Sequence, residues 1–432
     1  MIEISNAFIG FLFMILLMLA GVSIAASLFL TAALGALLYL GTATLMSFGN
    51  TMWGALNNFI LTSIPLFILL GEVLVRSGVT DRMYRTLSYW LAPLPGGLLH
   101  SNIVSCGLFA AISGSSVATA ATMGTVAVPA MKARKYNEKL VLGSIAAGGT
   151  LGILIPPSIN MIIYGAITNT SIGSLFIAGI IPGITLCLLF MLLMLVMCVV
   201  KPSLSGRKDE LPLLSERIKS LSGLIAPGVV FLVVMGGIYL GWTTPTEAAA
   251  VGVVIALLIA LYYRRLTWQL LHDAFLSTIR TTSMILLIIL AAFFLNYVVA
   301  LLGIPQAITN FVAELGATPM QTIWMLVLLY ILLGCFLETL SMMIATVPVV
   351  VPLVVSMGFD PVWFGIFLVI MMELSLITPP VGLNLYVVQG IRTQGSITDV
   401  MLGALPFMVI MLIMTALIIF FPGLVLWLPG QI

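Results

Sequence analysis

The sequence predicts an all-α polytopic membrane protein whose chain forms an inverted repeat, and three observations support this fold class. Hydrophobic residues make up 62% of the chain and charged residues only 7%, whereas a soluble domain carries about 25% charged residues. Continuous apolar runs of about 20 residues, long enough to cross a bilayer as helices, recur along the sequence. Pro-Pro pairs stand at 156–157 and 379–380, which are 223 positions apart, inside apolar segments that resemble each other.

The first half, residues 1–200, begins with predicted spans at roughly 3–21, 23–40 and 59–76. The first run lacks a basic leader, so we expect a span and not a cleaved signal. Segment 97–131 is short for two crossings and contains small polar residues at its centre, which predicts a re-entrant helical hairpin with its tip at Ser113, Gly114, Ser115 and Ser116. A helix at about 140–168, broken at Pro156, and a span at about 175–200 complete this half.

The second half, residues 222–432, repeats this plan after a polar linker at 201–221. We expect spans at roughly 222–241, 245–263 and 281–303, a hairpin at about 320–356, a helix at about 362–390 broken at Pro379, and a span at about 402–428. The repeat spacing aligns Glu338 and Thr339 with Ser115 and Ser116, which places them at the tip of the second hairpin.

The distribution of basic residues predicts the topology. Lys and Arg cluster at 76–85, 132–139, 201–219 and 264–280, and only Arg392 follows. Basic loops prefer the cytoplasm, so the first hairpin enters from the inside. The flanks of the second hairpin, 304–319 and 357–361, contain no Lys or Arg, so it enters from the outside. The halves are then inverted, and both termini are expected on the periplasmic side.

The two proline pairs suggest a chemical role for the broken helices. A proline lacks the N–H group and frees the carbonyl four residues earlier, which here gives free carbonyls at Gly152, Ile153, Ser375 and Leu376. Carbonyl and hydroxyl oxygens suit a hard cation, and the helix N-termini after the breaks suit a carboxylate. Matched broken helices in two halves are typical of a sodium-coupled anion transporter. The alternative is that the prolines only kink two helices.

Residues near the breaks are candidates for binding the carboxylate of a substrate: Ser116, Ser158, Asn160, Pro380, Asn384, Arg280 and Arg392. Each has a structural alternative. The amides can satisfy stray backbone groups, the arginines can anchor helices at the cytoplasmic interface, and the small residues of the first hairpin can allow close helix packing.

Charged residues inside spans are expected to be functional or paired. Glu72 and Arg76, four residues apart, predict a structural ion pair, while Glu338 and Glu373 are candidates for polarity at the site. Four cysteines without a CxxC spacing are expected to be packed thiols. The chain lacks a Walker A loop and an HExxH motif, so neither an ATPase nor a membrane metalloprotease, nor any other enzyme, is predicted.

Four motifs carry a family resemblance: SGSSVATAATMG (113–124), GTLGILIPPSI (149–159), TPTEAAAVG (244–252) and ITPPVGLNLYV (377–387). With these motifs the chain resembles, over nearly its whole length, the large membrane subunit of tripartite ATP-independent periplasmic (TRAP) transporters, the DctM type. The resemblance implies a multi-pass protein of the bacterial inner membrane that imports an organic acid, such as a dicarboxylate or sialic acid, by an elevator mechanism. It implies Na⁺ as the coupling ion and no other cofactor or metal.

The resemblance also implies partners and a sodium site. The partners are a periplasmic substrate-binding protein (DctP type) and a small four-helix membrane subunit (DctQ type), and no nucleic acid is involved. The implied sodium-site residues are Ser113, Gly114, Ser115, Ser116, Gly152, Pro156, Glu338, Thr339, Thr378, Pro379 and Gly382. The alternative function is a stand-alone sodium/anion symporter of the two-hairpin type that needs no binding protein.

Overall fold

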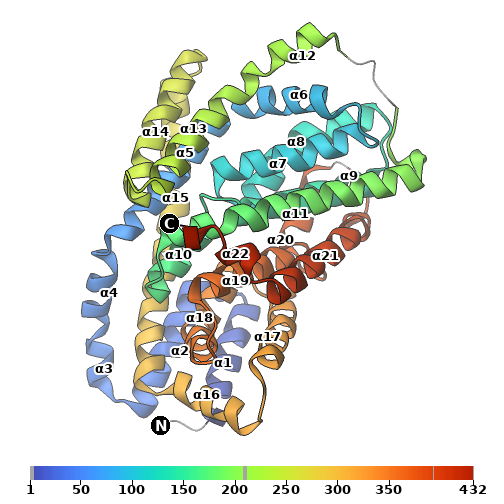
Figure 1. The fold of residues 1–432 in the computed structure, drawn as a ribbon. Helices are drawn as coiled ribbons and strands as arrows, with labels where there is room; N and C mark the ends of the chain where they lie inside the picture. Colours follow the sequence, from blue (N-terminus) through green and yellow to red (C-terminus); the bar gives the residue numbers. More distant parts are fainter. Residues whose placement is uncertain (1–3, 208–211, 393, 432) are drawn as a thin grey trace.

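The computed structural model describes residues 4–207, 212–392 and 394–431, and this part of the chain is helical without a strand (Figure 1). Its first half contains α1 (Ile4–Leu19), α2 (Ile24–Tyr39), α3 (Thr42–Met46), α4 (Phe48–Leu56), the 3-10 helix η1 (Phe59–Thr62), α5 (Ser63–Arg76), α6 (Val79–Leu91), α7 (Gly97–Ser113), α8 (Ser116–Ala133), α9 (Glu138–Leu154), α10 (Ile159–Thr168) and α11 (Ile172–Val200).

The linker and the second half are helical in the same way. They contain η2 (Pro202–Leu204), α12 (Leu214–Ser220), α13 (Ser222–Tyr239), α14 (Pro245–Tyr262), α15 (Trp268–Leu301), α16 (Ile304–Glu314), α17 (Pro319–Gly334), α18 (Thr339–Ser356), α19 (Pro361–Ile377), α20 (Leu383–Ile391), α21 (Ile397–Phe420), α22 (Gly423–Leu426) and η3 (Pro429–Gln431). Part of the predicted linker, 208–211, and the first residue of the predicted span 3–21 lie outside the described residues.

Many of the described helices can cross a membrane. Seven are long and apolar enough to do so, and the number rises to nine if each of two bent helix pairs is one span. One of these pairs is α9 with α10, bent by 40° at the first proline pair. The polytopic helical fold class predicted from composition is therefore correct.

The two hairpins and the two broken helices recur at the predicted spacing. The second helix of each hairpin starts at Ser116 (α8) or Thr339 (α18), and these two starts are 223 positions apart. The broken helices start at Glu138 (α9) and Pro361 (α19), which are also 223 positions apart. The broken segments also run in opposite directions. The start of α9 lies beside the end of α20, where Arg392 and Glu138 are 3.1 Å apart. Towards the other end, the Tyr164 hydroxyl of α10 donates to the Pro361 carbonyl at 2.7 Å.

Four helical regions differ from the prediction. The expected span 281–303 belongs to a longer helix, α15, because Thr267 caps its start and no Gly or Pro interrupts residues 268–301. Helices α6 and α16 were not predicted, since each has only a narrow apolar stripe among polar residues. Residues 42–56 were not assigned either, and they form α3 and α4.

The TPTEAAAVG motif has a local structural role at the start of α14. The Thr244 hydroxyl accepts the backbone N–H of Glu247 at 3.3 Å, and the Glu247 carboxylate accepts the backbone N–H of Thr244 at 2.8 Å. This capping box satisfies two N–H groups that a helix start leaves free. Thr318 and Gln321 form the same arrangement at the start of α17.

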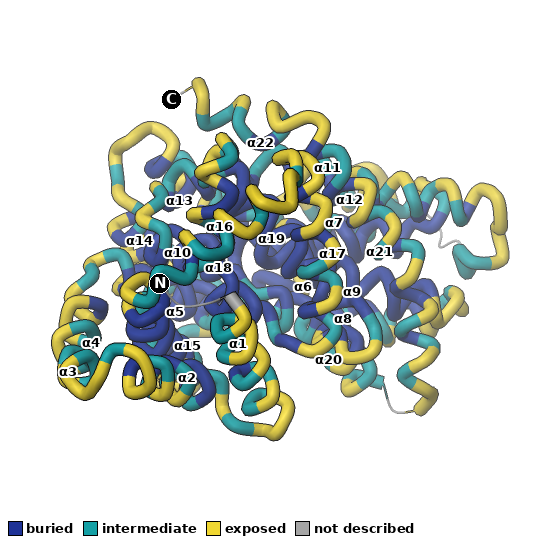
Figure 2. Tube along the Cα trace, turned by 90° about the horizontal axis from the view of Figure 1, so that it is seen from below, coloured by how far each residue is buried: buried dark blue, intermediate teal, exposed yellow. Residues whose placement is uncertain are grey.

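The helices pack in two groups that meet near the centre of the molecule. The first includes α1 to α5 with α13 to α15, where α14 packs on α5 and α15 packs on α2 and α5. The second is centred on α9, which packs on α7, α8, α19 and α21. Figure 2 shows buried residues gathered around α5, α18 and α19, and exposed residues along α3 and α4 at one edge.

The crossing of α9 and α21 is the tightest contact between the two halves. A Cβ atom added to Gly143 would clash with the Gly403 carbonyl, and one added to Gly403 would clash with the Lys139 carbonyl. The two backbones approach this closely only because both positions are glycine, as is common where membrane helices cross.

Candidate functional site

The first tip (residues 113–116) is a turn rich in oxygen atoms between α7 and α8. Gly114 has a φ angle of +59°, in the left-handed region that glycine adopts without steric cost. Ser115 caps α8, and its hydroxyl accepts the backbone N–H of Ala118 at 3.4 Å. The Ser113 hydroxyl lies 2.9 Å from that of Thr119, which donates to the Ser115 carbonyl at 2.7 Å. Hydroxyl and carbonyl oxygens therefore converge at the start of α8.

This tip packs directly against the first break (residues 155–158). A Cβ atom on Gly114 would lie 2.8 Å from the Pro157 carbonyl oxygen, and one on Gly152 would lie 2.8 Å from the Cα of Ser116. The Ser116 hydroxyl donates to the Thr150 carbonyl at 3.3 Å. The structure thus brings the predicted tip residues together with Gly152 and the proline pair, through backbone contacts that leave no room for larger residues.

The first break itself is enclosed. Pro156, Pro157 and Ser158 are buried, and the bond between the two prolines is cis. Ser158 caps α10 by accepting a backbone N–H of its first turn at 3.4 Å. Asn160 follows in this turn, and its buried amide nitrogen has no hydrogen-bond partner among the described residues. This amide therefore has a donor to offer at the start of α10.

The second tip (residues 335–339) uses a charged cap where the first uses a serine. Glu338 precedes α18, and its carboxylate accepts the backbone N–H groups of Leu340 at 3.1 Å and Ser341 at 3.3 Å. It also accepts the Thr339 hydroxyl at 2.9 Å. The negative charge of Glu338 is thus held at a helix N-terminus, where the helix dipole stabilises it.

The second tip contacts the second break (residues 378–382). The Cys335 thiol lies 3.4 Å from the Pro379 carbonyl oxygen, and the Thr378 hydroxyl donates to the Leu374 carbonyl at 2.7 Å. Pro379 is half-buried and Pro380 is exposed, so this break is more open than the first. Gly382, with a φ angle of +49°, leads into α20.

Asn384 is the counterpart of Asn160, because each is the second residue of the helix that follows a break. The second break is one residue longer, so these two asparagines are 224 positions apart and not 223. The Asn384 amide is already engaged: its Nδ2 donates to the Ala146 carbonyl of α9 at 3.1 Å. The two asparagines therefore have different surroundings despite equivalent positions.

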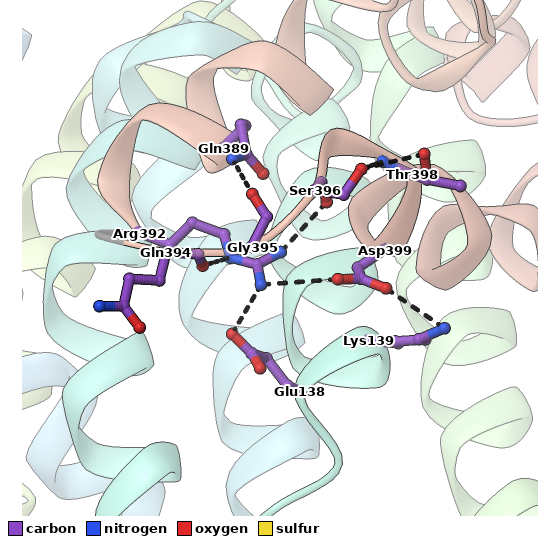
Figure 3. Close-up of polar contacts among 9 residues, drawn as sticks. All are labelled: Glu138, Lys139, Gln389, Arg392, Gln394, Gly395, Ser396, Thr398 and Asp399. Atoms are coloured by element: carbon purple, nitrogen blue, oxygen red, sulfur yellow. Dashed lines mark hydrogen bonds and ion pairs between the residues drawn. The ribbon is translucent and has the colours of Figure 1, made fainter.

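Arg392 lies in a polar cluster at the start of α9 and α21, which Figure 3 shows. Its guanidinium is 3.1 Å from the Glu138 carboxylate and 3.6 Å from that of Asp399, and Asp399 also pairs with Lys139 at 3.2 Å. It also donates to the Gln394 carbonyl at 2.6 Å. The guanidinium is fully occupied at the far ends of the broken helices, a geometry that favours the anchoring alternative over substrate binding.

Arg280 lies on α15, which packs on α2 and α5. It is exposed on α15, three residues after Ser277, whose hydroxyl donates to Glu72 at 2.7 Å. Glu72 pairs with Arg76, which confirms the predicted structural ion pair. Among the described residues, no hydrogen bond or ion pair joins Arg280 to the other predicted substrate-binding residues.

Three contact residues were missed from the sequence: Thr119, Thr150 and Cys335. Thr119 and Thr150 contact the first tip, and Cys335 contacts the second break. Their positions within one or two turns of the tips and breaks were the only available signal. The described residues contain no group of three or more His, Cys, Asp or Glu side chains placed to hold a metal ion. The first tip and break present hydroxyl and carbonyl oxygens, and the second tip adds the Glu338 carboxylate.

Comparison with known solved structures shows a transporter fold. The chain is similar to the YdaH transporter of Alcanivorax borkumensis, with a TM-score of 0.61 and 16% identity over 95% of this chain and 98% of that one. It is also similar to the MtrF efflux pump of Neisseria gonorrhoeae, with a TM-score of 0.54 and 13% identity over 98% of this chain and 95% of that one. At these identities the likeness concerns the fold alone.

Sequence comparison is more specific. The family model described as "Tripartite ATP-independent periplasmic transporter, DctM component" matches residues 11–424. The C4-dicarboxylate TRAP transporter large permease protein DctM of Pseudomonas aeruginosa is 36% identical over 94% of each chain. The sialic acid TRAP transporter large permease protein SiaM of Vibrio cholerae is 33% identical over 96% of each chain. This chain therefore belongs to the DctM family of TRAP transporter large permeases.

Proposed function

We propose that this chain is the transmembrane permease of a sodium-coupled importer of an organic acid, which a periplasmic binding protein delivers. The observation that carries the proposal is the pairing of each tip with its own break, repeated in the two halves. Each pair gathers oxygen atoms that can hold a sodium ion: hydroxyl and carbonyl oxygens at the first, joined by the Glu338 carboxylate at the second. Each break also starts a new helix, α10 or α20, whose N-terminus attracts a carboxylate.

The substrate class follows from the relatives and from the chemistry of the breaks. The relatives are named for C4-dicarboxylate and for sialic acid, and both substrates carry a carboxylate. Ser158 and the unpaired amide of Asn160 start α10, and Asn384 starts α20. We assign the carboxylate to the region between these two helix starts.

The packing supports an elevator movement. The helices that pack on α9 or α19 include both tips and both breaks, because α7 and α8 pack on α9 while α17 and α18 pack on α19. Helices α1 to α5 with α13 to α15 form the separate group. We assign the first group to a moving domain and the second to a scaffold that a small membrane subunit braces. In this assignment the protein resides in the bacterial inner membrane with both termini in the periplasm.

Reconstituted transport tests the proposal. The chain is placed in proteoliposomes with its small subunit, and uptake of a labelled C4-dicarboxylate or sialic acid is measured with a binding protein that carries it. We expect uptake only with an inward sodium gradient. Uptake that persists when sodium is equal on both sides would overturn the coupling. Uptake without any binding protein would favour a stand-alone symporter.

A further inference from the structure

Glu373 is an unpaired acid in the centre of the molecule. It lies on α19 with 0% of its surface exposed. Its carboxyl group lies near the backbone N–H groups of Ile153 and Leu154 of α9, and neither of its oxygens has a hydrogen-bond partner among the described residues. A buried acid is ionised only where a positive charge lies close to it, because an unpaired buried charge is strongly unfavourable. Its presence here therefore needs a functional explanation.

No basic side chain of the surrounding helices neutralises this acid. The described helices packed against α19 are α9, α10, α11, α17, α18, α20, α21 and α22. Within their bounds the only Lys or Arg is Lys139, at the opposite end of α9, where it pairs with Asp399 at 3.2 Å. Fourteen residues of helix separate Lys139 from Ile153, or about 21 Å at about 1.5 Å per residue.

The position of Glu373 relates it to both breaks. Ile153 and Leu154, which it touches, are the last residues of α9 before the first break. Along α19 it precedes Thr378, where the second break starts, by five residues, or about 8 Å. The repeat-equivalent position in α9 is Thr150, a neutral residue. Glu373 is thus the one acid of the broken helices near both breaks, because Glu138, the other acid within their bounds, starts α9 at its opposite end.

We propose that Glu373 is the fixed counter-charge for the sodium ions bound at the two breaks. This inference rests on the proposed sodium coupling. The first break is buried and offers hydroxyl and carbonyl oxygens, which coordinate a cation but do not balance its charge. At the second break, the charge of Glu338 is already stabilised by the start of α18. Glu373 acts through space and is a positioning charge, not a ligand.

The expected effect follows from Coulomb's law. A unit charge about 8 Å from a cation, at an effective dielectric constant of about 20, stabilises it by about 2 kcal/mol. That energy corresponds to about a 30-fold change in affinity. Removing the charge should therefore raise the sodium concentration that gives half-maximal effect by about 30-fold.

Sodium-dependent thermal stabilisation of the purified protein tests this without relying on transport. The wild type and Glu373→Gln are unfolded over a range of sodium concentrations, with potassium replacing sodium to keep the ionic strength constant. We expect a shift of about 30-fold in Glu373→Gln and little shift in Glu373→Asp, which keeps the charge. Glu314→Gln, which removes an exposed acid of α16, is the matched control and should match the wild type.

A wild-type sodium response in Glu373→Gln would overturn the inference. If that variant does not fold, infrared spectra of the wild type replace it, because Glu373 is the only fully buried Asp or Glu among the described residues. A protonated carboxyl band in the sodium-saturated protein at neutral pH would then refute the counter-charge, and its absence would support it. A wild type that sodium neither stabilises nor drives in uptake would refute the proposed coupling itself.

Discussion

The two pairs of tip and break share a backbone plan but differ in chemistry and enclosure. In the first pair, the cap is the neutral Ser115, and Pro156 is buried beneath the tip. In the second pair, the cap is the charged Glu338, and Pro380 is exposed. The spacing of 223 residues preserves where the helices start and stop, while the side chains at matched positions have diverged.

The two pairs also differ in the contacts that hold each tip to its break. The first pair is held by close backbone contacts, so its geometry is set by glycines. In the second pair, the Cys335 thiol contacts the Pro379 carbonyl, while the Glu338 carboxylate holds the start of its own helix, α18. Substitutions at matched positions should therefore differ in their effects on stability and transport.

The largest effect is expected where the two halves cross. Gly143→Leu places a side chain into the Gly403 backbone, which no rotamer can relieve, and should cost about 3 kcal/mol or more. The repeat-equivalent change, Ile366→Leu on α19, should cost less than about 1.5 kcal/mol. Thermal unfolding and yield in detergent measure both. Equal stability of the two variants would show that the crossing is looser than the structure indicates.

The next effect concerns the contact between the first tip and its break. Gly114→Ala combines a left-handed backbone with a Cβ atom 2.8 Å from the Pro157 carbonyl, so we expect a loss of about 2–3 kcal/mol and of uptake. The control is Gly358→Ala, which has a φ angle of +89° but open space around it. It should cost only about 1–2 kcal/mol of backbone strain. A loss as large in Gly358→Ala would mean that the Pro157 contact contributes nothing.

The two caps should differ by their charge. Ser115→Ala removes one hydrogen bond and should cost about 1 kcal/mol. Glu338→Ala removes the bonds to Leu340 and Ser341 together with a favourable charge, so its cost should approach about 2 kcal/mol. Thermal unfolding without sodium separates capping from cation binding. If Glu338→Gln were as stable as the wild type, the charge would have no capping role.

The matched asparagines allow stability and binding to be separated. Asn384→Ala breaks the bond to Ala146 and should cost about 1 kcal/mol. Asn160→Ala removes no hydrogen bond of the described structure, so it should leave stability unchanged and raise the KM of uptake by about tenfold. Unfolding and uptake are measured on the same preparations. The assignment fails if Asn160→Ala destabilises the protein and leaves KM unaltered.

The smallest effect is expected at the rim of the Arg392 cluster. Lys139 is half-exposed, so Lys139→Met should cost less than about 1 kcal/mol, and high salt should reduce the difference further. Lys135→Met, a nearby change without an ion pair among the described residues, serves as the control. A cost well above 1 kcal/mol would show that the cluster acts as one cooperative network.

The helical fold class and the matched hairpins and breaks could be predicted because they have local signals. The Pro-Pro pairs and the run of small residues at 113–116 fix where helices stop, whatever the rest of the chain does. Helices α6 and α16 escaped prediction because half of their residues are polar. The start of α15 escaped because charged residues at its exposed beginning resemble a loop.

The site was predictable in its parts and less so in its contacts. That Ser113–Ser116 would meet the first break followed from the family resemblance. The ion pair of Arg392 could not be predicted, because Glu138 lies more than 250 residues earlier in the chain. The repeat spacing of 223 residues does not align Asn160 with Asn384, because the second break contains one extra residue. The different surroundings of the two amides were therefore not evident from the sequence.

Because the two broken helices are antiparallel, a single measurement decides which membrane face each end of this helix pair occupies. The Arg392 cluster joins the start of α9 to Arg392 and the start of α21 at one end, and the contact of Tyr164 with Pro361 marks the opposite end. A probe that reaches one member of an end must therefore approach the other from the same membrane face. A single accessibility label at either end therefore shows how both halves are oriented in the membrane. Two labels that disagree would reveal a misinserted chain.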